Sequence, residues 1–142
     1  MSEEEEEEEE EENVQVLREL YGAFDRDDRE ALRRRLDPDI EWSPLLGPLL
    51  GVGTVRGADS VIDFLSEVPE IIEGFRVVPE KLIAIDDSRV LALEVRHGRP
   101  HGTDADIRQE AGVIYTLRNR RVLSVESFSN PREALQAAGL SE

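Results

Sequence analysis

A glutamate and an arginine two positions apart are the residues of this sequence that best suit catalysis. Glu94 and Arg96 lie in a strand-like run, Arg89–His97, so both side chains should point to one face of a sheet. A carboxylate beside a guanidinium could serve as a base with an electrophilic partner. The alternative is an ion pair on an exposed sheet face, opposite the apolar residues of 91–95. We favour that ion pair, because structural ion pairs also resemble functional sites.

Two histidines raise the possibility of a metal site. His97 and His101 flank Gly98 and Pro100, and Asp104 and Asp106 follow. A metal site would need further ligands at fixed geometry. Gly and Pro are typical of a turn, so we interpret this segment as a polar hairpin loop. We expect neither a metal nor a cofactor.

Two aromatic residues are candidates for binding. Trp42 is the sole tryptophan and follows the apolar alternation of a short strand, so it should line a pocket mouth or pack in the core. Tyr115 shares a face with Val113 and Leu117, and its hydroxyl could reach a ligand or a buried partner.

The elements that position these residues begin with helices. Leu17, Leu20, Tyr21 and Phe24 recur at helical spacing and predict a helix over Asn13–Arg26. The sequence then predicts a second helix capped by Asp27 and Glu30 and ended by Pro38, a strand with Ile40 and Trp42, an apolar loop over Pro44–Gly57, and a third helix ending before Pro69.

Strands dominate the second half of the chain. Four runs with strand-like patterns are separated by turn-forming residues: Phe75–Ile85, Arg89–His97, Asp106–Arg118 and Arg121–Ser129. Short turns between successive strands predict an antiparallel meander. Asn130 and Pro131 predict the start of a final helix, which Gly139 ends. Helices followed by a long curled sheet make the fold class α+β.

Length and composition indicate one domain of 142 residues with a single core. The chain has no cysteine and no apolar run of about 18 residues, so we expect a cytoplasmic protein without a membrane span or secretory signal.

Glu3–Glu12 are ten consecutive glutamates. Removing them from the 33 acidic residues leaves 23 against 17 basic residues, a net charge of −6. This acidic balance argues against nucleic acid as a partner.

Like charges repel at helical spacing, so the glutamate run should be disordered or at most a frayed helical extension. We therefore divide the chain into a disordered tail at 1–12 and a single folded domain at 13–142.

An ordered set of segments resembles the SnoaL-like domains of the nuclear transport factor 2-like superfamily. The resemblance lies in Leu20–Phe24, Leu36–Trp42, Phe75–Val77, Gly112–Leu117 and Asn130–Leu135. It implies a cone-shaped roll, in which a strongly curved, mostly antiparallel sheet is wrapped by N-terminal helices and encloses a small-molecule pocket. Relatives include polyketide cyclases, ketosteroid isomerases and limonene-epoxide-hydrolase-like enzymes, and fold alone does not select among them.

The resemblance allows the catalytic sets of these enzymes to be compared with this chain. The epoxide-hydrolase set falls near Glu94, Arg96 and Ser127, where a serine replaces the carboxylate that activates water. The isomerase base falls at Ser43 or Trp42, and neither is a base. Cyclases use an acidic residue and a histidine, for which the chain offers Glu94, Glu110, Glu126, His97 and His101 without a convincing placement.

Two functional hypotheses follow. The first is a small-molecule enzyme or binder whose apolar pocket is lined by Trp42, Phe64, Arg96, Tyr115 and Ser127, with Leu45–Leu50 as a lid. The second is a non-catalytic dimeric interaction or ligand-binding module. Polyketide-cyclase-like or isomerase-like activity is a further alternative.

We also expect a homodimer. Apolar residues occupy both faces of the strands, as at Val90 and Leu91 or Val113 and Ile114. Because helices should cover one face, a second subunit is the expected cover for the other.

Overall fold

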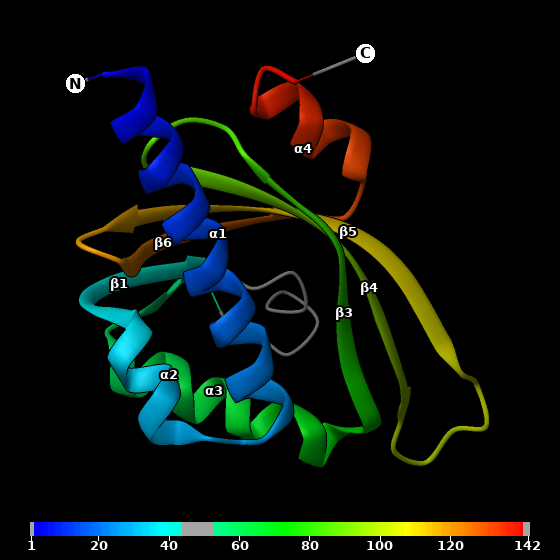
Figure 1. Ribbon diagram of the computed structural model, residues 1–142. Helices are drawn as coiled ribbons and strands as arrows, with labels where there is room; N and C mark the ends of the chain where they lie inside the picture. Colours follow the sequence, from blue (N-terminus) through cyan, green and yellow to red (C-terminus); the bar gives the residue numbers. More distant parts are fainter. Residues whose placement is uncertain (1, 44–52, 141–142) are drawn as a thin grey trace.

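The computed structural model describes residues 2–43 and 53–140, which form four helices and one six-stranded sheet (Figure 1). The predicted α+β class is confirmed. The elements are α1 (Glu3–Asp25), α2 (Arg29–Arg35), β1 (Leu36–Ser43), β2 (Val55–Arg56), α3 (Ala58–Ile71), β3 (Ile72–Ala84), β4 (Arg89–Pro100), β5 (Ile107–Arg118), β6 (Arg121–Phe128) and α4 (Pro131–Ala137).

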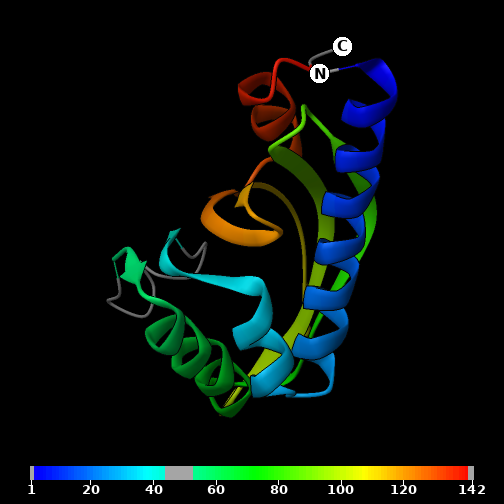
Figure 2. The ribbon, with the colours of Figure 1, turned by 60° about the vertical axis from the view of Figure 1, so that its left-hand side comes forward.

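The sheet has the order β2-β1-β6-β5-β4-β3 and is antiparallel except where β1 runs parallel to β6. The predicted meander from β3 to β6 is therefore present. Asn119 and Arg120 connect β5 to β6 with φ angles of 53° and 63°, the left-handed conformation of a tight hairpin turn that follows the strand twist. Figure 2 shows the sheet curling between α1 on one side and α2 with α3 at its lower end.

The inner face of the sheet packs against the first three helices. Apolar residues of α1, including Val16, Leu17 and Leu20, form one core cluster with Val90 of β4 and Val113 of β5. This burial of apolar surface is the main force that holds α1 across the sheet.

The outer face of the sheet is partly covered by α4. Leu91 and Ile114 form a separate cluster with Ala134 and Ala138 of that helix. A Cβ built on Gly112 would lie 2.3 Å from the Cβ of Ala134, so the helix reaches the strand only because residue 112 is glycine. The sequence argument assigned the cover of Ile114 to a second subunit, and this was wrong, because α4 supplies it within the same chain.

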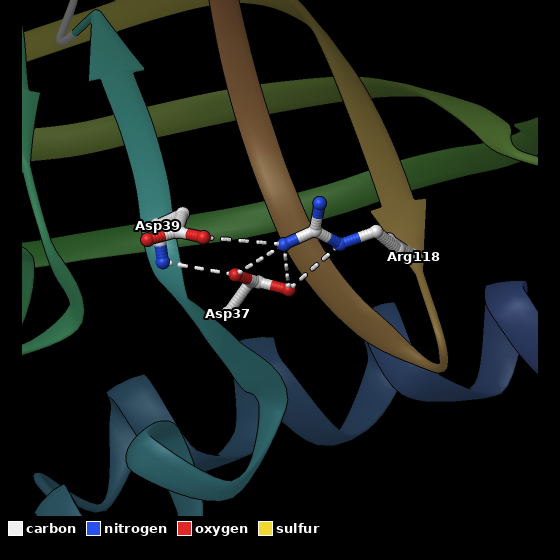
Figure 3. A network of polar contacts seen from close by, with 3 residues as sticks. All are labelled: Asp37, Asp39 and Arg118. Atoms are coloured by element: carbon white, nitrogen blue, oxygen red, sulfur yellow. Dashed lines mark hydrogen bonds and ion pairs between the residues drawn. The ribbon is translucent and has the colours of Figure 1, made fainter.

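An ion-pair network holds the irregular start of β1 (Figure 3). The register of β1 against β6 shifts between Leu36 and Glu41. In this segment the buried Asp37 accepts hydrogen bonds from Arg118 at 3.0–3.3 Å and from the backbone N–H of Asp39 at 2.9 Å. The network anchors β1 to the end of β5 and so helps to place Trp42 further along the strand.

Several predicted boundaries need correction. The helix cap is Asp28 rather than Asp27, because the Asp28 side chain accepts the N–H of Ala31 at 3.1 Å. Helix α3 continues through Pro69 to Ile71. A proline in the last turn loses one backbone hydrogen bond and therefore need not end the helix.

Two segments expected as loops contain strand residues. Val55 and Arg56 form β2, which pairs with β1, whereas the proposed lid, Leu45–Leu50, lies outside the described residues. Strand β4 continues to Pro100 instead of ending at His97. Gly98, which suggested a turn, lies in this strand because its missing Cβ makes room for Ile72, whose Cγ2 would be 2.4 Å away.

The glutamate run forms the first turns of α1 and is helical, whereas the division of the chain treated residues 1–12 as a disordered tail. Glu3–Glu8 are exposed, and folded contacts strengthen further along, where Glu12 forms an ion pair with Arg120 and the Asn13 side chain donates to the carbonyl of Asp87 at 2.9 Å. In the described part of the chain, none of the helices is long and apolar enough to span a membrane.

Candidate functional site

A cavity of about 80 Å³ lies between the inner face of the sheet and helices α1, α2 and α3. Most of its wall is apolar, with four aromatic residues and six aliphatic ones: Phe24, Trp42, Phe64, Phe75, Leu20, Leu32, Leu65, Val68, Val77 and Val113. Its polar lining consists of Tyr21, Glu94, Arg96 and Tyr115. Apolar walls with a few convergent polar groups are typical of small-molecule sites.

The four polar residues form one connected network. The Tyr21 hydroxyl donates to Glu94 Oε2 at 2.6 Å and lies 2.9 Å from the Tyr115 hydroxyl. Arg96 donates from Nε to Glu94 Oε1 at 2.8 Å, and its Nη2 lies 2.7 Å from the same oxygen. Each carboxylate oxygen of Glu94 therefore has at least one donor.

Neighbouring elements bring these residues together. Glu94 and Arg96 occupy alternate positions of β4, Tyr115 lies on the adjacent β5, and Tyr21 approaches from α1. The Tyr115 ring packs edge-on against both Tyr21 and Trp42, with centroid distances of 6.1 Å and 6.5 Å. This geometry is favourable for aromatic pairs and limits how far the hydroxyl groups can move.

Burial determines the electrostatics of the network. The Glu94 side chain is 2% exposed and that of Arg96 13%. A buried charge is tolerated when it is paired and hydrogen-bonded, as both are here. The pair has no net charge, which makes the polar end of the cavity suited to neutral ligand groups.

Both tyrosines are held in the neutral form. Burial raises the pKa of the Tyr21 hydroxyl well above its usual value of 10.0, and the nearby Tyr115 and Glu94 raise it further. Burial and then the charge of Glu94 raise the pKa of Tyr115, outweighing the opposite effects of Tyr21 and Arg96. Both side chains therefore carry one hydroxyl proton at physiological pH.

The structure brings together four of the residues expected to bind a ligand, since Trp42, Phe64, Arg96 and Tyr115 all line the cavity. Ser127 is not among the lining residues, and its buried Oγ has no hydrogen-bond partner in the described part of the chain. The favoured interpretation of Glu94 and Arg96 as a pair on an exposed face was wrong. They do pair, but on the inner face, because the apolar residues of 91–95 face the other side of the sheet.

Sequence reasoning left Tyr21 out of the predicted site. We used it as one of the apolar positions of the first helix, whereas its hydroxyl is the link between Glu94 and Tyr115. A polar atom on the buried stripe of a helix was the available signal, because a buried hydroxyl normally needs a partner.

The histidines take no part in this site. His97 lies at the partner position of Arg76 on β3, and His101 follows the end of β4. Across residues 2–43 and 53–140, no three His, Asp or Glu side chains are grouped closely enough to hold a metal ion.

Comparison with known proteins identifies the family. Residues 17–125 match the family model described as SnoaL-like domain. The chain belongs to the SnoaL-like domain family. No protein of curated function matches the sequence of this SnoaL-like protein.

Solved structures share the nuclear transport factor 2-like fold. An NTF2-like protein of unknown function from Burkholderia pseudomallei is 28% identical, with a TM-score of 0.73 over 88% of this chain and 95% of that one. TerC co-crystallised with polyporic acid is 22% identical, with a TM-score of 0.72 over 90% and 98% of the two chains. A hypothetical protein with a ketosteroid-isomerase-like fold from Catenulispora acidiphila, in complex with trimethylamine, is 15% identical, with a TM-score of 0.69 over 88% and 92% of the two chains.

Proposed function

We propose that this SnoaL-like protein binds a small, largely apolar molecule in the inner-face cavity. The observation that carries the proposal is the network of Glu94, Arg96, Tyr21 and Tyr115 at one side of an otherwise apolar cavity. Burying four polar groups is costly, and a hydrophobic core without them would be simpler. A role in orienting the polar group of a ligand accounts for that cost.

Similar structures give this proposal support at the level of the fold. Polyporic acid and trimethylamine are small molecules bound by proteins with TM-scores of 0.72 and 0.69 to this chain. The open volume in the cavity supports ligand binding, because the protein's own side chains leave this space free. A cytoplasmic location, expected from a sequence without cysteine, belongs to the same proposal.

The proposed function excludes epoxide hydrolase and ketosteroid isomerase activity. Proton abstraction needs a placed base. Glu94 is the carboxylate that lines the cavity, and both of its oxygens already accept hydrogen bonds from Tyr21 or Arg96. Opening of simple epoxides, or isomerisation of a β,γ-unsaturated ketone, by the unmodified protein would show that this part of the proposal is wrong.

The direct test is calorimetric titration with toluene, a compact apolar probe. We expect saturable binding to the wild-type protein and clear weakening in Trp42→Ala, because Trp42 forms part of the wall. Circular dichroism should confirm that the variant is folded. Unchanged affinity in a folded Trp42→Ala variant, or no binding to the wild type, would contradict the assignment of the pocket.

A homodimer is also part of the proposal. Beyond the area under α4, the outer face continues over Val78, which is half-buried and pairs with the buried Val95 across β3 and β4. A second copy of the chain could cover this face. Light scattering at micromolar concentration should give twice the chain mass of 16.0 kDa. A monomer mass would exclude the dimer without affecting the cavity.

A further inference from the structure

The hydrogen bonds of the network have a defined direction, and the direction restricts what a ligand can offer. Glu94 Oε2 accepts the Tyr21 hydroxyl at 2.6 Å, a length typical of an O–H group donating to a carboxylate. Arg96 contacts Oε1 at 2.7–2.8 Å and holds the negative charge on this side chain. An ionised carboxylate has no proton to give, so Tyr21 is the donor in its bond to Glu94.

The next bond follows from counting protons. A tyrosine hydroxyl has one proton and can accept further hydrogen bonds through its lone pairs. The proton of Tyr21 is used toward Glu94, so the 2.9 Å contact between the two hydroxyls must use the proton of Tyr115. Tyr115 then has no proton left, and its oxygen presents lone pairs alone to anything that approaches from the cavity.

Arg96 completes the polar end. Its Nε and Nη2 are directed to Glu94, and the guanidinium has further N–H donors. A ligand group beside the network therefore meets an acceptor at Tyr115 and donors at Arg96. The neutrality of the Glu94–Arg96 pair disfavours a charged group, because no net charge compensates the loss of its hydration.

We infer that the cavity selects a neutral hydroxyl compound, an alcohol or phenol with an apolar body, over the corresponding carbonyl compound. The hydroxyl group donates to Tyr115 and can accept from Arg96, whereas a carbonyl oxygen facing Tyr115 meets lone pairs without a proton between them. The inference rests on the proposed function and specifies its ligand class.

Cyclohexanol and cyclohexanone are suitable probes, because they match in size and differ at the polar group. The chain has a single tryptophan, so its indole N–H signal in an NMR titration reports on this cavity directly. We expect wild-type protein to bind cyclohexanol roughly three- to tenfold more tightly than cyclohexanone, the value of about one hydrogen bond. Equal affinities, or tighter binding of the ketone, would overturn the inference.

Variants of the two tyrosines test the direction itself. Tyr115→Phe removes the acceptor, so the preference for cyclohexanol over cyclohexanone should disappear. Tyr21→Phe removes the group to which Tyr115 donates, which frees the Tyr115 proton for a ligand. The preference for cyclohexanol should then be lost, because a carbonyl oxygen can accept this proton as well as a hydroxyl oxygen can. A folded Tyr21→Phe variant that keeps the wild-type preference would contradict the inferred direction.

The outcomes separate the two claims. If toluene binds and cyclohexanol has no advantage, the proposed cavity stands and the ligand class is wrong. If none of the three probes shifts the Trp42 signal, the proposed function fails together with the inference. Should Tyr21→Phe not fold, the wild-type comparison and Tyr115→Phe still decide the matter.

Discussion

The two faces of the sheet are built on opposite principles. On the inner face, an arginine, a glutamate and two tyrosines surround open volume. On the outer face, α4 lies so close to β5 that residue 112 must be glycine. The first arrangement costs stability and leaves room for a ligand, whereas the second gains packing and leaves none. Alternate residues of the same strands therefore serve different purposes, and variants at adjacent positions can separate them.

The largest effect is expected when the inner ion pair is broken. Arg96→Met leaves Glu94 buried without its charged partner, which should lower the free energy of unfolding by about 3 kcal/mol. Denaturant unfolding at neutral pH measures the change. The matched control is Arg108→Met, because Arg108 pairs with Glu110 while both side chains are more than half exposed. That pair should be worth well under about 1 kcal/mol. Equal losses in the two variants would remove the distinction between the faces.

The next effect tests the outer face. Gly112→Ala places a Cβ against Ala134 and should cost about 2 kcal/mol through overpacking of α4. Gly53→Ala is the control, since no atom of the described residues lies within 4 Å of its added Cβ. Toluene affinity should stay unchanged in Gly112→Ala, because this glycine does not line the cavity. A change in affinity without a loss of stability would reverse the roles assigned to the two faces.

Alkaline pH should reveal the inner network. Tyr21 and Tyr115 are the chain's two tyrosines, and the pKa of each is raised in the folded state. The stabilisation that comes from these raised pKa values is present below the pKa of an unfolded tyrosine, about 10. It is lost as the pH rises above that pKa, since tyrosines of the unfolded chain ionise first. Stability should therefore fall by up to about 1.4 kcal/mol per pH unit for each tyrosine. The tyrosinate absorbance should appear only on unfolding. Early ionisation in the native protein would contradict the buried network.

The smallest effect is expected at the N-terminal glutamates. Glu3–Glu8 are exposed and precede the residues that contact the domain. Their deletion should change the free energy of unfolding by no more than about 0.5 kcal/mol, because they bury no apolar surface. Thermal unfolding of the shortened chain provides the measurement. A large loss would show that these turns of α1 dock on the domain.

Local signals in the sequence predicted much of the fold. The final helix began as expected, with the Asn130 side chain accepting the N–H of Arg132 and Pro131 in the first turn. Such caps depend on a few adjacent residues and can therefore be recognised without tertiary information. The meander was predictable for the same reason, because short turns connect its strands.

Features that depend on distant contacts were not predictable. Alternation placed Glu94 and Arg96 on one face, but both faces of β4 are covered, so apolar neighbours could not identify the inner one. Gly98 resembled a turn residue, and nothing local in the sequence connected Gly98 with Ile72 or Gly112 with Ala134. Tyr21 and Tyr115 are 94 residues apart, and nothing local connects their hydroxyl groups.

The most direct test of the inner-face cavity uses two adjacent valines of β3. Val77 lines the cavity and Val78 does not, and both are half-buried. Val77→Phe should fill the open volume and abolish the shift of the Trp42 indole N–H signal on titration with cyclohexanol. Val78→Phe should bind as the wild type does. Wild-type binding by a folded Val77→Phe variant would show that the ligand site lies elsewhere.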